Sequence, residues 1–70
     1  MSLGKKITLM REKLGITQTE LAERIQANQS TISKIEHGIN KPSAAVIYKI
    51  AKVLGCTVEY LMDDERRKEG

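Results

Sequence analysis

The chain has 70 residues, which is enough for one small domain and too few for two. Hydrophobic residues make up 40% of it and charged residues 30%, and no apolar run approaches the roughly 20 residues that span a bilayer. The start lacks the apolar stretch of a signal peptide. A single cysteine excludes an internal disulfide and a cysteine-rich zinc site, so we expect no cofactor, no metal and a reducing, cytosolic compartment.

The positive charge is concentrated before the C-terminal tail. The formal net charge is +3; residues 63–70 hold three basic and four acidic side chains, which leaves nine basic against five acidic ones in residues 1–62. A small basic domain favours polyanions such as nucleic acids. Two tyrosines with no phenylalanine or tryptophan argue against a protein that stacks single-stranded bases on aromatic rings. We predict a globular domain over residues 1–62 and a charged, frayed tail over residues 63–70.

The spacing of apolar residues is helical along the chain, and turn residues divide it into five segments. Gly15 and Gly38 stand where helices end, and Pro42 disfavours helix at the residue before it. Thr17 and Glu20 match a capping box, in which each side chain bonds the backbone N–H of the other at a helix start. Further N-caps are predicted at Asn28, Ser43 and Thr57.

Each segment has one apolar side, which predicts its buried face. In chain order these residues are Leu3, Ile7, Met10 and Leu14; Leu21, Ala22 and Ile25; Ile32 and Ile35; Ile47, Ile50, Ala51 and Leu54; and Val58, Leu61 and Met62. We also expect Cys56 to be a small buried residue, and Tyr48 and Tyr60 to be packing residues. The second and third segments are too short to persist alone in water, so tertiary packing must hold them. The predicted fold class is all-α, a compact five-helix bundle.

Residues 18–37 carry the functional signal. Two short helices joined by a tight turn at residues 26–28 are typical of a helix-turn-helix motif. The outward face of the second helix, at about residues 28–36, is polar: Gln29, Ser30, Ser33 and Lys34. Such a face is either a solvated surface or a set of side chains that read bases, and its place in this motif favours base reading.

Five stretches carry a family resemblance: ITQTELAERI at 16–25, QSTISKIEHG at 29–38, NKPS at 40–43, IAKVLG at 50–55 and EYLM at 59–62. Over residues 4–62 the chain resembles the phage Cro/repressor type of helix-turn-helix protein, also called the XRE family. The resemblance implies a lambda-repressor-like fold of five helices and sequence-specific binding of double-stranded DNA. It also implies a cytoplasmic homodimer, from a bacterium or phage, that represses transcription at a pseudo-palindromic operator.

The resemblance assigns roles to single residues as well. With the second helix of the motif in the major groove, the base-reading residues would be Gln29, Ser30, Ser33 and Lys34. The contacts to the DNA backbone would be Gln18, Thr31, Asn40, Lys41 and Arg11. Thr31 is equally open to local packing, and His37 is interpreted as a cation at the helix C-terminus. Arg11 and Glu36 stand where related repressors have a partly buried ion pair; the alternative is two independent surface charges.

One turn residue departs from the family pattern. Gln26 occupies a position where the family usually has glycine, because the residue there tends to adopt a positive φ. Either Gln26 carries a strain of about 1 kcal/mol, or the turn has a different geometry.

The fifth segment suggests how two copies would meet. Its residues Val58, Tyr60, Leu61 and Met62 provide more apolar side chains than so short a helix can bury inward, so we expect this edge to form the dimer contact. The alternative function is a protein-interaction module, for example an antitoxin that binds a toxin. We expect no enzymatic activity, because His37 and Cys56 have no obvious common pocket and no glycine-rich phosphate loop is present.

Overall fold

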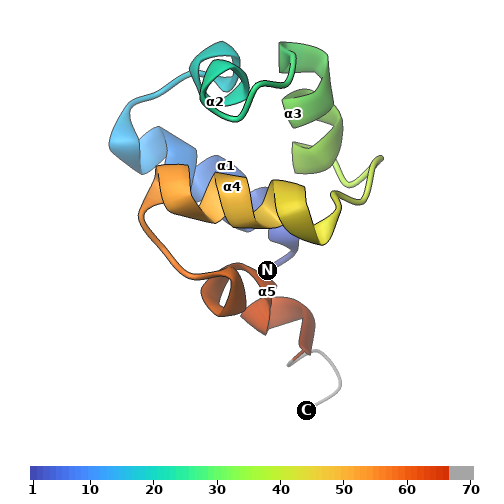
Figure 1. Cartoon of the computed structure of the whole chain (residues 1–70). Helices are drawn as coiled ribbons and strands as arrows, with labels where there is room; N and C mark the ends of the chain where they lie inside the picture. The colour runs from blue at the N-terminus through green and yellow to red at the C-terminus, as the bar shows by residue number, and fades with distance from the viewer. Residues whose placement is uncertain (67–70) are drawn as a thin grey trace.

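The computed structural model describes the backbone of residues 1–66 and the side chains of residues 1–63. Within that range it contains five helices and no strand: α1 (Leu3–Leu14), α2 (Gln18–Arg24), α3 (Gln29–Glu36), α4 (Ala44–Leu54) and α5 (Val58–Arg66). α2 and α3 lie at one end of the molecule, α1 and α4 lie below them, and α5 closes the opposite end (Figure 1). The predicted all-α fold of five helices is confirmed.

The helices begin at the predicted N-caps. Thr17 Oγ1 accepts a hydrogen bond from the Glu20 N–H at 3.0 Å, and the Glu20 carboxylate accepts one from the Thr17 N–H at 2.8 Å, so the capping box is confirmed. Side-chain oxygens cap three further helices in the same way, at Asn28, Ser43 and Thr57. Ser2 caps α1, which was not predicted. Local sequence therefore decides where these helices start.

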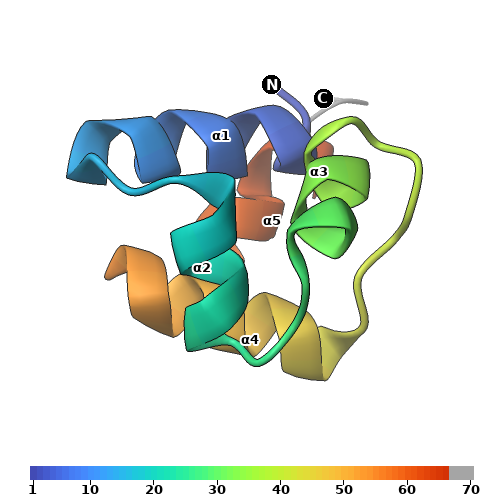
Figure 2. The same ribbon diagram turned by 90° about the horizontal axis from the view of Figure 1, so that it is seen from above.

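One apolar core joins all five helices. Its buried residues are Ile7, Leu21, Ala22, Ile25, Ile32, Ile35, Ile47, Ile50, Ala51, Leu54 and Leu61. The buried faces predicted for α2, α3 and α4 are therefore confirmed. The stripe predicted for α1 is wrong at Leu14, which is 52% exposed, because the last turn of α1 projects past α2 (Figure 2).

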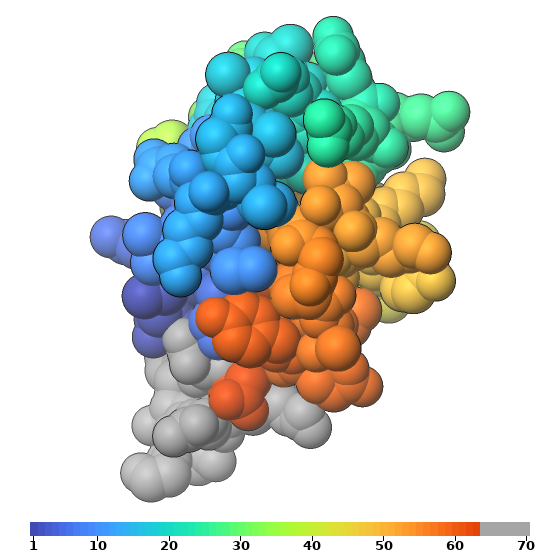
Figure 3. Space-filling view, turned by 90° about the vertical axis from the view of Figure 1, so that its left-hand side faces the viewer, coloured from blue at the N-terminus to red at the C-terminus, as the bar shows by residue number. Residues whose placement is uncertain are grey.

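α5 packs back against α1 and α4 and completes the core (Figure 3). Leu61 is 0% exposed, and Lys6 of α1 donates a hydrogen bond from Nζ to the Tyr60 carbonyl at 2.9 Å. α5 continues to Arg66, so the boundary predicted at residue 62 falls inside this helix. The rest of the predicted tail, residues 67–70, lies outside the described residues.

Three residues predicted as packing or buried lie closer to the surface than expected. Tyr48 and Tyr60 are 55% and 47% exposed, because the buried sides of their helices are formed by aliphatic neighbours. Each ring instead lies near a lysine ammonium, at 4.3 Å from Lys6 Nζ for Tyr60 and 5.5 Å from Lys52 Nζ for Tyr48. Cys56 is partly buried at the edge of the core, and this burial raises the pKa of its thiol.

The N-terminus of α1 meets the C-terminus of α3 at Gly4. A Cβ atom on Gly4 would lie 2.7 Å from the Ile35 carbonyl oxygen and closer still to that of Glu36. Both obstacles are backbone atoms, which cannot rotate away, so the close approach requires glycine. This contact places the last turn of α3 directly against α1.

Candidate nucleic-acid interface

The turn between α2 and α3 is tightly closed. The Ala27 N–H donates to the Ala22 carbonyl at 2.8 Å, and the Gln26 N–H donates to the Glu23 carbonyl at 3.2 Å. Gln26 has a φ of 62°, which lies in the left-handed region that glycine adopts most readily. Of the two interpretations of this position, the positive φ is the one that the structure adopts.

α3 turns an apolar side toward the core and a polar side outward. Ile32 and Ile35 are buried, whereas Gln29, Ser30 and Lys34 are exposed. Ser33 is half-buried. The four predicted base-reading residues therefore include three with exposed side chains, on a helix that the core holds from the other side.

Asn28 organises the start of α3. Its Oδ1 accepts hydrogen bonds from the Thr31 N–H at 3.0 Å, from the Thr31 hydroxyl at 2.8 Å and from the Ser30 hydroxyl at 3.2 Å. The hydroxyl protons of Ser30 and Thr31 are thus used within the chain. Their oxygens keep lone pairs for a further donor.

The loop after α3 is hydrogen-bonded to the last turn of that helix. The ring Nδ1 of His37 lies 2.8 Å from the Ser33 carbonyl oxygen, which accepts a hydrogen bond from this nitrogen when Nδ1 carries a proton. The Asn40 N–H donates to the Lys34 carbonyl at 3.4 Å. Asn40 and Lys41 are both exposed. The loop therefore holds the two predicted backbone contacts beside the outer face of α3.

Arg11 and Glu36 form an ion pair between α1 and α3. Arg11 Nε lies 2.8 Å from Glu36 Oε2, and Nη2 donates to Oε1 at 3.3 Å. The remaining terminal nitrogen, Nη1, donates to the Ile16 carbonyl at 2.9 Å. The two side chains are only 12% and 4% exposed, so the pair is not a pair of independent surface charges. It ties α1, the loop before α2 and the end of α3 together.

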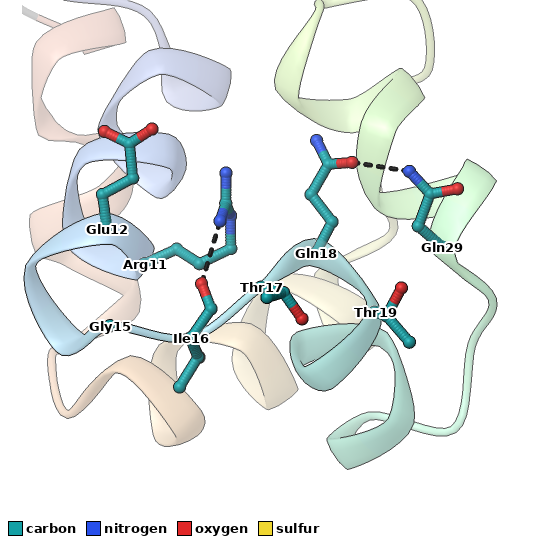
Figure 4. Close-up of a pocket in the computed structure, with 8 residues that line it drawn as sticks. All are labelled: Arg11, Glu12, Gly15, Ile16, Thr17, Gln18, Thr19 and Gln29. Carbon is teal, nitrogen blue, oxygen red and sulfur yellow. Dashed lines mark hydrogen bonds between the residues drawn. The ribbon is translucent and has the colours of Figure 1, made fainter.

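The pair extends through two glutamines to the outer face of α3. Gln18 Nε2 donates to Glu36 Oε1 at 2.9 Å. Gln29 Nε2 in turn donates to Gln18 Oε1 at 2.6 Å, the bond drawn between the two glutamines in Figure 4. Gln18 and Gln29 are the first residues of α2 and α3, so the bond joins the two helix starts. This contact was not predicted: the sequence marked both glutamines as functional, but eleven positions of separation give no periodic signal for a contact.

The charge on Glu36 is stabilised by these partners. Burial of the carboxyl opposes its ionisation, but hydrogen bonds from Arg11, Gln18 and Thr8, with the charge of Arg11, outweigh burial and lower the pKa of Glu36. Glu36 is therefore an ionised acceptor at neutral pH.

An open cavity of about 440 Å³ lies beside this network, between the end of α1 and the starts of α2 and α3 (Figure 4). Arg11, Gln18 and Gln29 line it together with the loop that joins α1 to α2. The described part of the chain contains no group of three or more His, Cys, Asp and Glu residues placed to hold a metal ion. None of the described helices has the length and apolar character needed to cross a membrane.

The predicted dimer contact needs one correction. Leu61 cannot take part in it, because its side chain is completely buried in the core of its own chain. Tyr60 is 47% exposed, and Val58 and Met62 are half-buried. These three residues remain available at the edge of α5.

The tight turn, the buried side of α3 and its exposed polar face define a helix-turn-helix protein. Residues 7–61 match the helix-turn-helix family, and the chain belongs to that family. It is 39% identical over 62 residues to an uncharacterised HTH-type transcriptional regulator of Archaeoglobus fulgidus, covering 86% of this chain and 89% of that protein. It is 31% identical over 62 residues to the HTH-type transcriptional regulator ImmR of Bacillus subtilis, covering 89% of this chain and 49% of that protein.

Two solved structures, of a repressor and of a master regulator, are similar. The P22 c2 repressor in complex with the synthetic operator 9T has a TM-score of 0.84 and 28% identity, covering 87% of this chain and 92% of that one. SinR, a master regulator for biofilm formation, in complex with DNA has a TM-score of 0.82 and 32% identity, covering 87% and 98%. The predicted membership of the Cro/repressor type is confirmed.

Proposed function

We propose that this protein is a transcriptional repressor that binds double-stranded DNA sequence-specifically with α3 in the major groove. The observation that carries the proposal is the polar outer face of α3 on a helix whose opposite side is locked into the core. The base-reading residues are Gln29, Ser30, Ser33 and Lys34. Its relatives are named as transcriptional regulators, and the two solved structures described above are a repressor with a synthetic operator and a master regulator with DNA.

The contacts to the DNA backbone flank this face on both sides. Gln18, Arg11 and Thr31 lie toward the starts of α2 and α3, and Asn40 and Lys41 follow the end of α3. To bind a phosphate oxygen, Thr31 would turn its hydroxyl proton away from Asn28 Oδ1. Each terminal nitrogen of Arg11 carries two N–H groups and uses one within the chain, so each keeps one for a phosphate oxygen. Excess positive charge in residues 1–62 favours the same ligand.

We further infer that two copies bind one operator in the cytoplasm. A single module of this size buries too little surface for tight binding, so a homodimer on a pseudo-palindromic site, with half-sites about 34 Å apart, is expected. The contact is formed by Val58, Tyr60 and Met62 at the edge of α5. Sedimentation that shows only monomers at high micromolar concentration, with or without operator, would exclude this arrangement.

Selection of bound sequences from a pool of random duplexes tests the proposal directly. The expected result is one enriched sequence with two-fold symmetry, bound with an affinity that falls with salt at a log–log slope of about −0.9 per neutralised phosphate. A pool that stays unenriched would contradict sequence-specific binding. In that case a protein partner such as a toxin becomes the better interpretation, since one structural neighbour is a complex of SinR with SinI. We propose no enzymatic role for either case.

A further inference from the structure

We propose that Glu36 sets which base α3 prefers, by fixing the orientation of the Gln18 and Gln29 amides. The inference rests on the proposed function, because it concerns the base that Gln29 contacts. Glu36 acts only through other residues: its side chain is 4% exposed, and Gln18 stands between it and Gln29. It is therefore a positioning residue.

The first step is the contact between Glu36 and Gln18. An ionised carboxylate has lone pairs and no proton, so it can only accept hydrogen bonds. An amide side chain has one accepting end and one donating end, and only the donating end of Gln18 can face Glu36. The structure has this arrangement, with Gln18 Nε2 at 2.9 Å from Glu36 Oε1. Because the acceptor is charged, the bond is stronger than one between neutral groups.

The second step is the contact between Gln18 and Gln29. With its nitrogen bonded to Glu36, Gln18 turns its Oε1 to Gln29, and because this oxygen only accepts, Gln29 must donate an N–H to it. The two atoms, Gln29 Nε2 and Gln18 Oε1, are 2.6 Å apart. Gln29 is then left with one N–H and its Oε1 for an outside partner, that is, one donor and one acceptor.

This remaining pair discriminates between the two purines. In the major groove adenine presents a donor at N6 and an acceptor at N7, whereas guanine presents acceptors at O6 and N7. The donor and acceptor left on Gln29 match adenine at both atoms. Against guanine, the Gln29 oxygen would face another acceptor. The ionised Glu36 therefore makes adenine the preferred base at this position.

Replacing Glu36 by glutamine should reverse the direction of the hydrogen bonds that run from residue 36 through Gln18 to Gln29, so that each donor becomes an acceptor. The guanidinium of Arg11 has only donors, so it would draw the new carbonyl oxygen toward itself and leave the new amide nitrogen facing Gln18. Gln18 would turn its oxygen to that nitrogen and its own nitrogen to Gln29. Gln29 would accept this bond with its oxygen and present two N–H groups outward, which suits the two acceptors of guanine.

The experiment uses the full chain and the enriched duplex from the random pool. Loss of preference at one base pair in Gln29→Ala identifies the pair that Gln29 contacts. The ratio of dissociation constants for guanine and adenine at that pair is then measured for the wild type, Glu36→Gln and Gln18→Leu. Glu23→Gln, an exposed residue of α2 with the same change of charge, serves as the matched control.

The wild type should prefer adenine by roughly five- to 150-fold, the range of one bidentate base contact. The preference should invert or vanish in Glu36→Gln and shrink toward one in Gln18→Leu, where the Gln29 amide is free to turn. Glu23→Gln should keep the wild-type ratio. Gln18→Leu leaves the ion pair of Arg11 and Glu36 in place, so it decides the question even if Glu36→Gln does not fold.

Two further outcomes separate the inference from the proposed function. If Glu36→Gln and Gln18→Leu weaken binding to every duplex by one factor and keep the ratio, the role of Glu36 in base choice is refuted while DNA binding stands. If the wild type shows no base preference, the proposed function fails and this inference fails with it.

Discussion

Replacing Gln26 by glycine should stabilise the protein. Gln26 has a φ of 62°, where a residue with a Cβ atom pays about 1–2 kcal/mol and glycine does not. The Gln26 side chain is exposed, so little packing is lost. Glycine also makes the unfolded chain more flexible, which costs about 0.4–1 kcal/mol. At the middle of these two ranges the net gain is about 0.8 kcal/mol, or a rise in Tm of about 3–6 °C for a domain of this size.

Thermal unfolding followed by circular dichroism measures this gain, and two controls isolate its cause. Gln26→Ala keeps a Cβ atom and therefore keeps the strain, so its Tm should not rise. Glu23→Gly places glycine at an exposed helical position of α2, where it should cost about 1 kcal/mol. If Gln26→Gly lowers Tm as Glu23→Gly does, the positive φ is not a source of strain and the reasoning is refuted.

Four other substitutions test separate parts of the molecule. Gly4→Ala should lower the free energy of unfolding by about 1–3 kcal/mol in urea denaturation, because its Cβ would meet the backbone of α3; an unchanged value would contradict the close approach. Because the pKa of Glu36 is lowered from its ordinary value of 4.5, the ionised carboxylate stabilises the folded chain at pH values above 4.5. This stabilisation should be lost as the pH falls through the lowered pKa. Urea denaturation at several pH values should show a smaller acid loss in Glu36→Gln; equal losses would assign the acid sensitivity elsewhere. Lys41→Ala should weaken binding to all duplexes alike and flatten the salt slope by about 0.9, whereas Lys34→Ala should relax specificity at one base pair. Identical selected sequences for wild type and Lys34→Ala would remove Lys34 from the base-reading set.

Features decided within a few residues could be predicted from the sequence. The capping box of Thr17 and Glu20 depends only on a spacing of three, so the residue types and their order are enough to predict it. The same holds for the buried sides of α2, α3 and α4, which follow from the helical period. The positive φ at Gln26 was visible only through the family pattern, as a departure from glycine.

Features decided by the packing of distant segments could not be predicted in the same way. The close approach at Gly4 joins residues about thirty positions apart, and no sequence pattern around this glycine predicts that it contacts another helix. The helical spacing predicted Leu61 on the buried side of its segment, but not that the core of the same chain covers it completely and removes it from the dimer contact, because this depends on how α5 folds back onto α1 and α4. The bond between Gln18 and Gln29 required both helix starts to be placed in space.

The placement of α3 explains why residues that touch no DNA should still affect its recognition. α3 has eight residues, too few to hold a helix in water, so its direction comes entirely from its attachments. Ile32 and Ile35 anchor its inner side, Gly4 admits its last turn against α1, and Glu36 connects that turn to Arg11 and Gln18. The free-energy cost of ordering α3 therefore falls in the folding step and not in the binding step. A substitution at Gly4 returns part of that cost to the binding step, and a loss of affinity should follow without the loss of any contact to a base or a phosphate.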